Sequence, residues 1–176
     1  MKIIRLVKKA QKGDRKAYSK LFQHYEDAVY RTAYIYMKDQ DDALDVLQET
    51  AYRSFTKIHT LKDPTYFKTW LIRIAINASF DMLRKRQNVV QLHPEMEEGI
   101  TDHDEVDIPL SISLQQLLHA LEDMEKSVIL LRFYHDYTIR ETAEILDIPI
   151  GTGKTILYRA LKKLRRMAEE ADVREQ

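Results

Sequence analysis

The sequence predicts an all-α fold in which two small helical domains are joined by a flexible acidic linker. Glycine and proline are scarce, with four of each among 176 residues, whereas many-stranded folds need more turn residues. Residues that favour helices, chiefly Leu, Ala, Lys, Arg and Glu, dominate the composition. Residues 88–110 contain seven acids and neither Lys nor Arg, and they separate two basic regions. We therefore expect domains at 1–87 and 111–176, with the linker at 88–110.

Charge and composition also exclude several classes of protein. The net charge of zero is a cancellation, because residues 1–87 carry 18 Lys or Arg against 10 Asp or Glu. The chain has no cysteine, which excludes disulfides and thiolate metal sites. No apolar run approaches the roughly 20 residues that span a bilayer, and the N-terminus lacks the apolar block of a signal peptide. We therefore expect a cytoplasmic protein without direct membrane insertion.

Helical spacing and capping residues predict the first elements of the N-terminal domain. Asp14 is expected to cap a helix that continues to Met37, and the segment KDQDD at 38–42 ends it. The next helix, over 41–58, carries an apolar stripe at every fourth position: Ala43, Leu47, Ala51 and Phe55. Its acidic side chains are expected to be solvated or to bind a basic partner.

A third predicted helix of this domain combines aromatic and cationic side chains. Asp63 is expected to cap it, Pro64 to occupy its first position, and the helix to run to residue 86. Aromatic rings stack on unpaired bases and cations bind phosphates, so this composition is typical of a surface that binds single-stranded nucleic acid. For Phe67 and Trp70, a place in the hydrophobic core is an equally good interpretation.

The C-terminal domain is expected to contain a helix-turn-helix over about 138–166, preceded by helices over 113–124 and 125–136. Thr138 caps its first helix, and the second helix begins at about residue 152. The predicted buried stripe of the second helix consists of Leu157, Ala160, Leu161 and Leu164. The opposite face is basic and contains no acid: Thr155, Arg159, Lys162 and Arg166.

The segment GTGKT at 151–155 resembles the end of a phosphate-binding loop, which suggests a nucleotide hydrolase. That loop requires the pattern G-x-x-x-x-G-K-[ST] after a buried strand. Ile148 stands where the first glycine must be, and the preceding residues have helical spacing. The sequence therefore favours a recognition helix, which reads base edges with its N-terminal residues and holds phosphates further along. The base-edge candidates are Lys154, Thr155, Tyr158 and Arg159, and the phosphate candidates are Lys162, Lys163 and Arg166.

Three segments together resemble one family, the extracytoplasmic-function sigma factors of bacterial RNA polymerase. DALDVLQETAYRSF is similar to the core-polymerase-binding segment of that family, and FKTWLIRIAINASFDMLRKRQ to its promoter-melting and minus-ten-reading segment. The segment from Leu121 to Arg166 is similar to its minus-thirty-five-reading domain. The resemblance implies a non-catalytic protein that binds core RNA polymerase and promoter DNA. It also implies an anti-sigma partner, often membrane-anchored, and a role in a stress or envelope response.

The resemblance assigns roles residue by residue. The positions that match the segment that docks on the clamp of the largest polymerase subunit are Asp45, Gln48 and Glu49. The positions that match the minus-ten segment are Phe67, Trp70, Arg73, Asn77, Asp81, Arg84 and Lys85. The positions that match the minus-thirty-five surface are Arg132, Lys154, Thr155, Tyr158, Arg159 and Lys162. The acidic linker is expected to thread through the polymerase, where its charge mimics nucleic acid.

Two positions differ from the family pattern. The family usually has an apolar residue such as Val where this chain has Gly153, and a basic residue where it has Ile156. We expect the glycine to cost roughly 1 kcal/mol in helix propensity. We expect the missing cation to weaken phosphate attraction or to change which promoter is read.

Other site types are disfavoured. The six histidines show no clustered spacing, and the acidic segment at 102–107 lacks the glycine and the closing Glu of a calcium loop. No metal or other cofactor is therefore expected. The alternative outside the sigma family is an ordinary helix-turn-helix repressor or activator that binds duplex DNA as a dimer. That alternative leaves the motifs of residues 1–87 unexplained.

Overall fold

The computed structural model describes residues 2–92, 118 and 120–174, and all regular elements in these ranges are helical. The chain divides into two compact units, Met1–Val106 and Asp107–Gln176, here called unit 1 and unit 2. Unit 1 contains α1 (Lys2–Gln11), α2 (Arg15–Gln23), α3 (Glu26–Met37), α4 (Gln40–Lys57), the 3₁₀ turns η1 (Ile58–Thr60) and η2 (Pro64–Tyr66), and α5 (Phe67–Leu92). Unit 2 contains α7 (Asp123–Ile129), the π-helical turn η3 (Leu130–Tyr134), α8 (Ile139–Leu146) and α9 (Ile150–Arg174).

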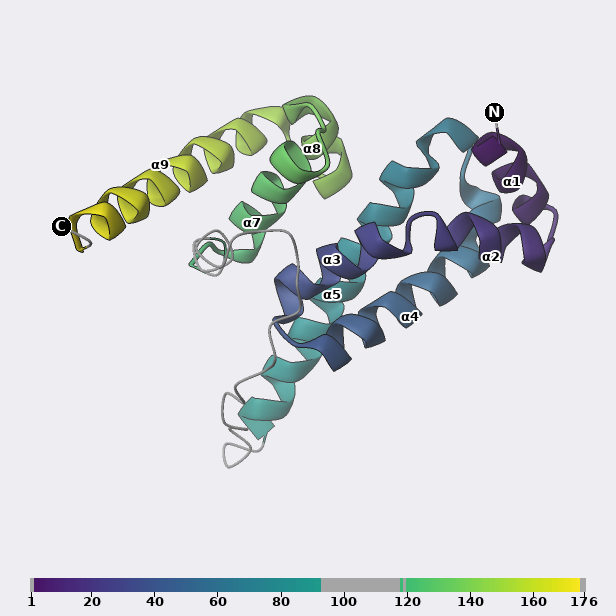
Figure 1. The fold of residues 1–176 in the computed structure, drawn as a ribbon, viewed down its shortest axis with the longest axis horizontal. Coiled ribbons are helices and arrows are strands. Elements are labelled where there is room, and N and C mark those ends of the chain that lie inside the picture. The colour runs from purple at the N-terminus through teal and green to yellow at the C-terminus, as the bar shows by residue number, and fades with distance from the viewer. Residues whose placement is uncertain (1, 93–117, 119, 175–176) are drawn as a thin grey trace. The chain divides into compact units, whose positions relative to one another are not determined.

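The core of unit 1 lies between α3, α4 and α5, which pack on one another (Figure 1). Each of these helices contributes a stripe of fully buried side chains, including Val29 and Ala33 from α3, Val46 from α4, and Leu71 and Ala75 from α5. Helix α1 packs on α2 and on the two 3₁₀ turns that precede α5. The amide of Gln11 reinforces this contact by donating to the carbonyls of Ile58, at 3.2 Å, and Leu61, at 2.7 Å.

The helix predicted from Asp14 to Met37 is two helices, which corrects the sequence-based prediction. Asp14 caps α2 as expected, since its carboxylate accepts from the amide of Ala17 at 2.9 Å. The chain then leaves the helical path at His24 and Tyr25, and the amide of Tyr25 donates to the carbonyl of Phe22 at 2.8 Å. The break brings the Tyr25 ring to 5.7 Å from that of Phe67, a tertiary contact that helical periodicity does not reveal.

Aspartate carboxylates also cap the remaining helix starts of unit 1, at Asp63 as predicted and at Asp39, which was not predicted. Lys38 ends α3 in the left-handed conformation with φ 60°, and the Asp39 carboxylate caps α4 by accepting from the amide of Asp42 at 2.9 Å. The Asp63 carboxylate accepts from the amide of Thr65 at 2.9 Å, and Pro64 opens the 3₁₀ turn that leads into α5. Helix α5 continues to Leu92, five residues beyond the predicted boundary at residue 87. The rest of the predicted linker lies outside the described residues.

Unit 2 is held together around Leu118, Leu121, Ile129 and Ala160, with Leu157 and Leu164 packed against them. Thr138 and Glu141 form the capping box that starts α8, which confirms the predicted cap. Asp147 ends α8 with φ 56°, and α9 begins at Ile150, two residues earlier than predicted. The helix predicted over 125–136 is α7 followed by the π-helical turn. Leu161 is 38% exposed, so its predicted place in the buried stripe is wrong.

Candidate nucleic-acid and protein interfaces

The outward face of α4 combines acidic, polar and apolar side chains. Asp45 and Gln48 are exposed, and Glu49 is partly exposed. Leu44 and Tyr52 share this side of the helix, with 43% and 68% of their surface exposed, because residues four apart lie one above the other. The sequence-based prediction missed both, although their spacing from Gln48 was a usable signal. Exposed apolar residues among acids are typical of a surface that binds another protein.

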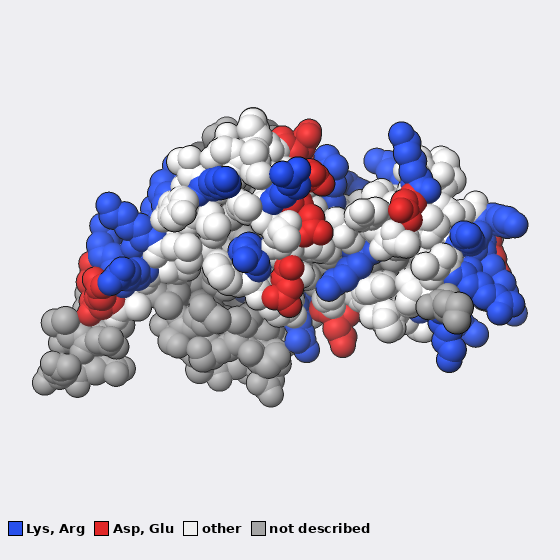
Figure 2. Space-filling model, turned by 90° about the horizontal axis from the view of Figure 1, so that it is seen from above, with Lys and Arg blue, Asp and Glu red and all other residues white. Residues whose placement is uncertain are grey.

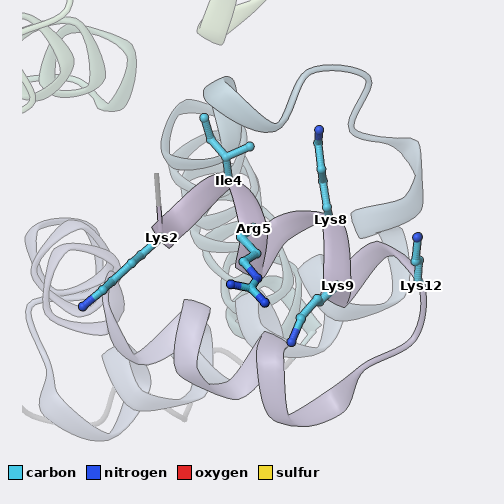
Figure 3. A pocket seen from close by; sticks show the side chains of 6 residues that line it. All are labelled: Lys2, Ile4, Arg5, Lys8, Lys9 and Lys12. Carbon is cyan, nitrogen blue, oxygen red and sulfur yellow. The ribbon is translucent and has the colours of Figure 1, made fainter.

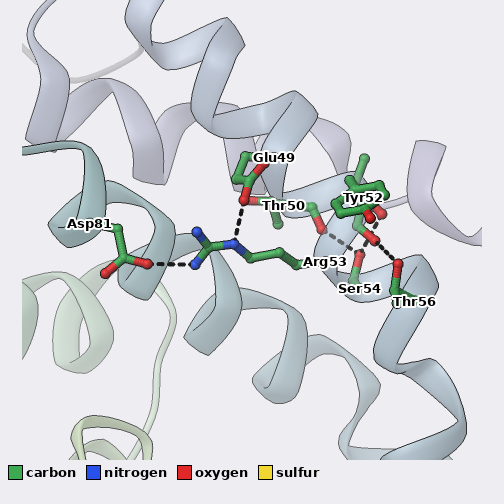
Figure 4. A network of polar contacts seen from close by, with 8 residues as sticks. Glu49, Thr50, Tyr52, Arg53, Ser54, Thr56 and Asp81 are labelled. Atoms are coloured by element: carbon green, nitrogen blue, oxygen red, sulfur yellow. Dashed lines mark hydrogen bonds and ion pairs between the residues drawn. The ribbon is translucent and has the colours of Figure 1, made fainter. Parts of the chain in front are cut away.

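Arg53 connects this face of α4 to α5. Its Nε donates to the Glu49 carboxylate at 2.6 Å, and a terminal nitrogen donates to the Asp81 carboxylate at 2.7 Å. Figure 4 shows the guanidinium lying between the two carboxylates, one from each helix. Hydrogen bonding to Asp81 raises the pKa of Arg53 above its ordinary value. Sequence analysis did not identify Arg53, since its role depends on a residue 28 positions away.

A shallow groove between α4 and α5 brings two predicted sets of residues together. The residues that line it are Asp45, Gln48, Glu49, Tyr52, Arg53, Ala78, Asp81, Met82 and Lys85. The whole predicted polymerase-binding set therefore lies beside two members of the minus-ten set. The Arg53 ion pairs join the two sets, because Glu49 belongs to one and Asp81 to the other.

Helix α5 presents a polar and cationic face. Arg73, Asn77, Arg84 and Lys85 are exposed on it, and no carboxylate in the described residues pairs with Arg73 or Lys85. Asp81 is occupied by Arg53 and also lies 3.8 Å from the Arg84 guanidinium. The exposed residues of this set are therefore available to a ligand.

Of the two interpretations of Phe67, a DNA contact or a core position, the structure favours the core. Its side chain is 0% exposed and is among the largest fully buried groups in the described part of the chain. The Trp70 ring, whose centroid lies 5.9 Å from that of Phe67, is only partly buried. Core packing therefore accounts for Phe67, whereas Trp70 keeps a surface on which a base can stack.

The recognition surface of α9 starts in its first turns. Lys154, Thr155, Tyr158 and Lys162 are exposed, and Tyr158 has 74% of its surface free. The segment GTGKT lies entirely inside α9, and helix α8 precedes it rather than a strand. This arrangement confirms that the segment is not a phosphate-binding loop. The Thr155 hydroxyl donates back to the Gly151 carbonyl at 3.0 Å.

Arg159, another predicted base-edge residue, already has a partner inside unit 2. Its Nε donates to the Glu125 carboxylate at 2.6 Å, and Lys163 donates to the other oxygen of the same carboxylate at 2.8 Å. Burial opposes the charged form of Glu125, but these hydrogen bonds outweigh it, so the pKa lies below its ordinary value. The fully buried Glu125 thus fixes two cations of α9 against α7. Sequence analysis did not identify this residue.

Gly153 and Ile156 face the interior of unit 2, which corrects the expectation that they alter DNA contacts directly. Ile156 is 8% exposed, so a missing cation at this position leaves no gap on the basic face. A Cβ on Gly153 would lie 3.5 Å from the Ala143 Cβ and 3.6 Å from the Ile139 Cδ1. Gly153 is therefore a packing position between α8 and α9.

Arg132, predicted to face minus-thirty-five DNA, belongs to the π-helical turn. A terminal nitrogen of its guanidinium donates to the Tyr137 carbonyl at 3.3 Å, and the group lies 5.8 Å from the centroid of the Phe133 ring. Phe133 is 56% exposed. The contacts hold the guanidinium at the surface, beside an exposed ring.

Within the described residues, no group of His, Asp or Glu side chains has the arrangement of a metal site. None of the helices there is long and apolar enough to cross a membrane.

Comparisons with known proteins match both units. A family model described as sigma-70 region 2 matches residues 21–89, and one described as sigma-70 region 4 matches residues 117–166. The chain is 30% identical to the ECF RNA polymerase sigma factor SigW of Bacillus subtilis strain 168, over 97% of this chain and 98% of that protein. It is 35% identical to the RNA polymerase sigma factor SigV of the same strain, over 85% and 89%.

Solved structures with the same fold include two sigma factors. One is the sigma factor RpoE from Bartonella quintana, solved with the anti-sigma factor NepR, with a TM-score of 0.75 and 22% identity over 88% of this chain and 98% of that chain. The other is CnrH in complex with the cytosolic domain of CnrY, with a TM-score of 0.70 and 20% identity over 97% and 99%.

Proposed function

The chain belongs to the ECF group of sigma-70 RNA polymerase sigma factors, and we propose that its exposed faces divide the work of that group between them. Such a subunit directs transcription initiation and is not itself an enzyme. In the proposal, the α4 face binds core RNA polymerase, the α5 face binds the minus-ten element, and the α9 face binds the minus-thirty-five element. The protein acts in the cytoplasm, where promoter DNA and RNA polymerase are located.

The proposal rests mainly on one observation: the exposed face of α4 is acidic and partly apolar, whereas those of α5 and α9 are cationic. The α4 face offers carboxylates with exposed Leu44 and Tyr52, a composition suited to a basic, partly apolar protein surface. A carboxylate-rich helix repels DNA, so this face is unsuited to nucleic acid. The polymerase-binding set, Asp45, Gln48 and Glu49, lies on it.

The α5 face suits DNA whose bases have been exposed by melting. Arg73, Arg84 and Lys85 supply cations for the phosphate backbone, and Asn77 supplies an amide that can bond to a base edge. Trp70 is the aromatic residue of this set whose side chain is partly exposed, so a base can stack on it. Asp81 acts through Arg53 rather than by touching DNA, since its carboxylate is already bonded.

The α9 face suits the major groove of duplex DNA. Lys154, Thr155 and Tyr158 project from the first turns, where a recognition helix reads base edges, and Lys162 follows for a phosphate. Arg159 retains a half-exposed side chain while bonded to Glu125, so it serves as a phosphate contact of fixed direction. Arg132 contributes a further cation from the π-helical turn.

We further propose that an anti-sigma protein holds the chain inactive by covering the same faces. RpoE of Bartonella quintana was solved with the anti-sigma factor NepR, and CnrH with the cytosolic domain of CnrY. A bound inhibitor that covers the α4 face prevents polymerase binding and leaves the DNA-binding residues of the chain unaltered. Release of the inhibitor is the step at which a stress or envelope signal acts.

Run-off transcription on fragmented genomic DNA tests the proposal. Core polymerase with the purified chain is expected to produce discrete start sites that are absent with core alone, and mapping them yields the promoter. A triple substitution of Asp45, Gln48 and Glu49 by Ala should remove transcription together with core binding. A chain that binds an intact palindromic duplex but not the core enzyme would instead be an ordinary helix-turn-helix regulator.

A further inference from the structure

Helix α1 carries a second cationic surface that none of the predicted sites uses. Lys2, Arg5, Lys8, Lys9 and Lys12 are all exposed, and together they are called the α1 basic face. They follow one another at helical spacing on the side opposite to Val7 and Ala10, which are 0% and 2% exposed. Figure 2 shows Lys and Arg side chains gathered at the end of unit 1 that carries α1 and α2.

These cations lack partners among the residues that the structure describes. No carboxylate in that part of the chain forms an ion pair with any of the five, whereas Arg53, Arg86, Arg159 and Lys163 are each paired. Figure 3 shows their side chains extended, with the charged ends apart from one another. Four of these charges lie on α1 and the fifth, Lys12, lies in the turn that follows it. Like charges this close in the chain repel each other, so the face costs stability unless an anion binds to it.

The face is also held firmly beside the start of α5. The Gln11 amide bonds to the carbonyls of Ile58 and Leu61, and α1 packs on the 3₁₀ turn from which α5 continues. The exposed ring of Tyr66 lies in that same turn. A strand of nucleic acid that binds along α5 therefore has a cationic surface next to the N-terminal end of that helix.

We propose that the α1 basic face binds the phosphate backbone of promoter DNA adjacent to the segment bound by α5. The inference rests on the proposed function of α5. The side chains of the face and Ile4 line a shallow concavity, so that aliphatic stems and charged groups lie together there. That combination fits a sugar–phosphate chain, and it supplies affinity without sequence information.

A membrane surface fits this face less well. Amphipathic helices bind membranes by burying an apolar side in the lipid, and the apolar side of α1 is buried inside unit 1. An acidic protein surface is the remaining competitor, and the experiment separates it from DNA.

The test uses holoenzyme assembled from core polymerase and the full chain on a promoter mapped by run-off transcription. The neutral variant carries Arg5→Gln, Lys9→Gln and Lys12→Gln. The matched control carries Arg5→Lys, Lys9→Arg and Lys12→Arg, which keeps every charge and changes only the shape of the groups. Thermal unfolding of both variants is compared with the parent, and affinity for core polymerase and for promoter DNA is measured by fluorescence anisotropy at several salt concentrations.

Each phosphate contact contributes about 0.7 to 0.9 to the slope of log affinity against log salt. Loss of three contacts should therefore lower the slope by about 2 to 3, with core affinity unchanged. Between about 50 and about 200 mM salt, the parent then loses about 20- to 40-fold more promoter affinity than the neutral variant does. The charge-conserving control should keep the slope of the parent.

Three outcomes would overturn the inference. An unchanged slope in the neutral variant means that DNA does not reach α1. A neutral variant that is folded but no longer binds core polymerase means that the face docks on a protein instead. If the charge-conserving control loses as much slope as the neutral variant, charge is not the cause. A parent chain that fails to bind promoter DNA with core polymerase refutes the proposed function itself, which is a different result.

Discussion

Gly153 offers a sharp test of the packing between α8 and α9. In Gly153→Ala, the new methyl group points at the Ala143 Cβ, the Ile139 Cδ1 and the Ile148 Cδ1, at 3.5, 3.6 and 3.9 Å. These are ordinary van der Waals separations, so the methyl group enters without displacing a neighbour. We therefore expect the substitution to stabilise unit 2.

Two contributions set the expected change in the free energy of unfolding of unit 2. Glycine inside a helix costs about 0.5 to 1 kcal/mol relative to alanine, because its backbone loses more freedom on folding. Gly153 lies inside α9, since its amide donates to the Pro149 carbonyl at 3.0 Å. A buried methyl group adds up to about 0.8 kcal/mol. The expected gain is about 0.5 to 1.8 kcal/mol, and each kcal/mol raises the unfolding midpoint of a domain of this size by about 4 to 8 °C.

Gly151→Ala is the matched control. A Cβ at Gly151 meets nothing within 4 Å, so only the backbone contribution remains. The single tryptophan, Trp70, lies in unit 1 and does not report on unit 2. Amide hydrogen exchange of peptides from α8 and α9, with far-UV circular dichroism, is therefore the suitable assay. Gly153→Ala should protect these peptides more than Gly151→Ala does.

Faster exchange in Gly153→Ala than in the parent would refute this reasoning. It would mean that α8 and α9 approach more closely than the structure has them, and that glycine is required at the crossing. Whichever way its stability changes, Gly153→Ala should keep its affinity for minus-thirty-five DNA, because the added methyl group faces α8 and not the exposed face of α9.

The remaining predictions concern charged groups. Glu125→Gln should lower the unfolding midpoint of unit 2 at neutral pH, because it weakens the hydrogen bonds to Arg159 and Lys163. Since the pKa of Glu125 is lowered by folding, its contribution is present above the unfolded pKa of about 4.3 and is lost as pH falls through the folded value. The variant should therefore lose less stability in acid than the parent. Arg53→Gln should lower the free energy of unfolding of unit 1 by about 0.5 to 1 kcal/mol, measured by Trp70 fluorescence in urea. Lys154→Gln should lower the salt slope of minus-thirty-five binding by about 0.9.

Each of these three test variants has a control variant, which lies on the same helix or on a helix packed against it. Glu144→Gln changes an exposed acid of α8 and should keep the acid sensitivity of the parent. Lys57→Gln changes an exposed cation of α4 and should leave unit 1 as stable as before. Lys154→Arg keeps the charge and should keep the salt slope. If the control and the test variant behave alike in any pair, the contact in question has no separate role.

Local sequence signals predicted much of the fold because the groups that cap a helix are close together in the chain. The Asp14 and Asp63 carboxylates, both predicted as caps, accept from the amides three and two residues ahead. The break at Tyr25 escaped prediction for the opposite reason. Its ring packs near Phe67, 42 positions later, and that contact is not written in the local periodicity.

The same distinction applies to the candidate interfaces. Spacing alone predicted that Thr155, Lys162 and Arg166 share one exposed face of a helix, and all three are exposed, because helical geometry is the same in every context. Only the tertiary structure decided that Phe67 and Ile156 are buried, since burial depends on which other helix lies against each side chain.

The sequence by itself determined the helical class and the family, because these depend on composition, periodicity and short motifs. The tertiary structure alone decided which cations are committed and which are free. Arg159 and Lys163 are bound to Glu125, and Arg53 to Glu49 and Asp81, across helices that are distant in the chain. A charged side chain is available to a ligand only if no opposite charge lies beside it in space, and such neighbours come from helices that are distant in the sequence.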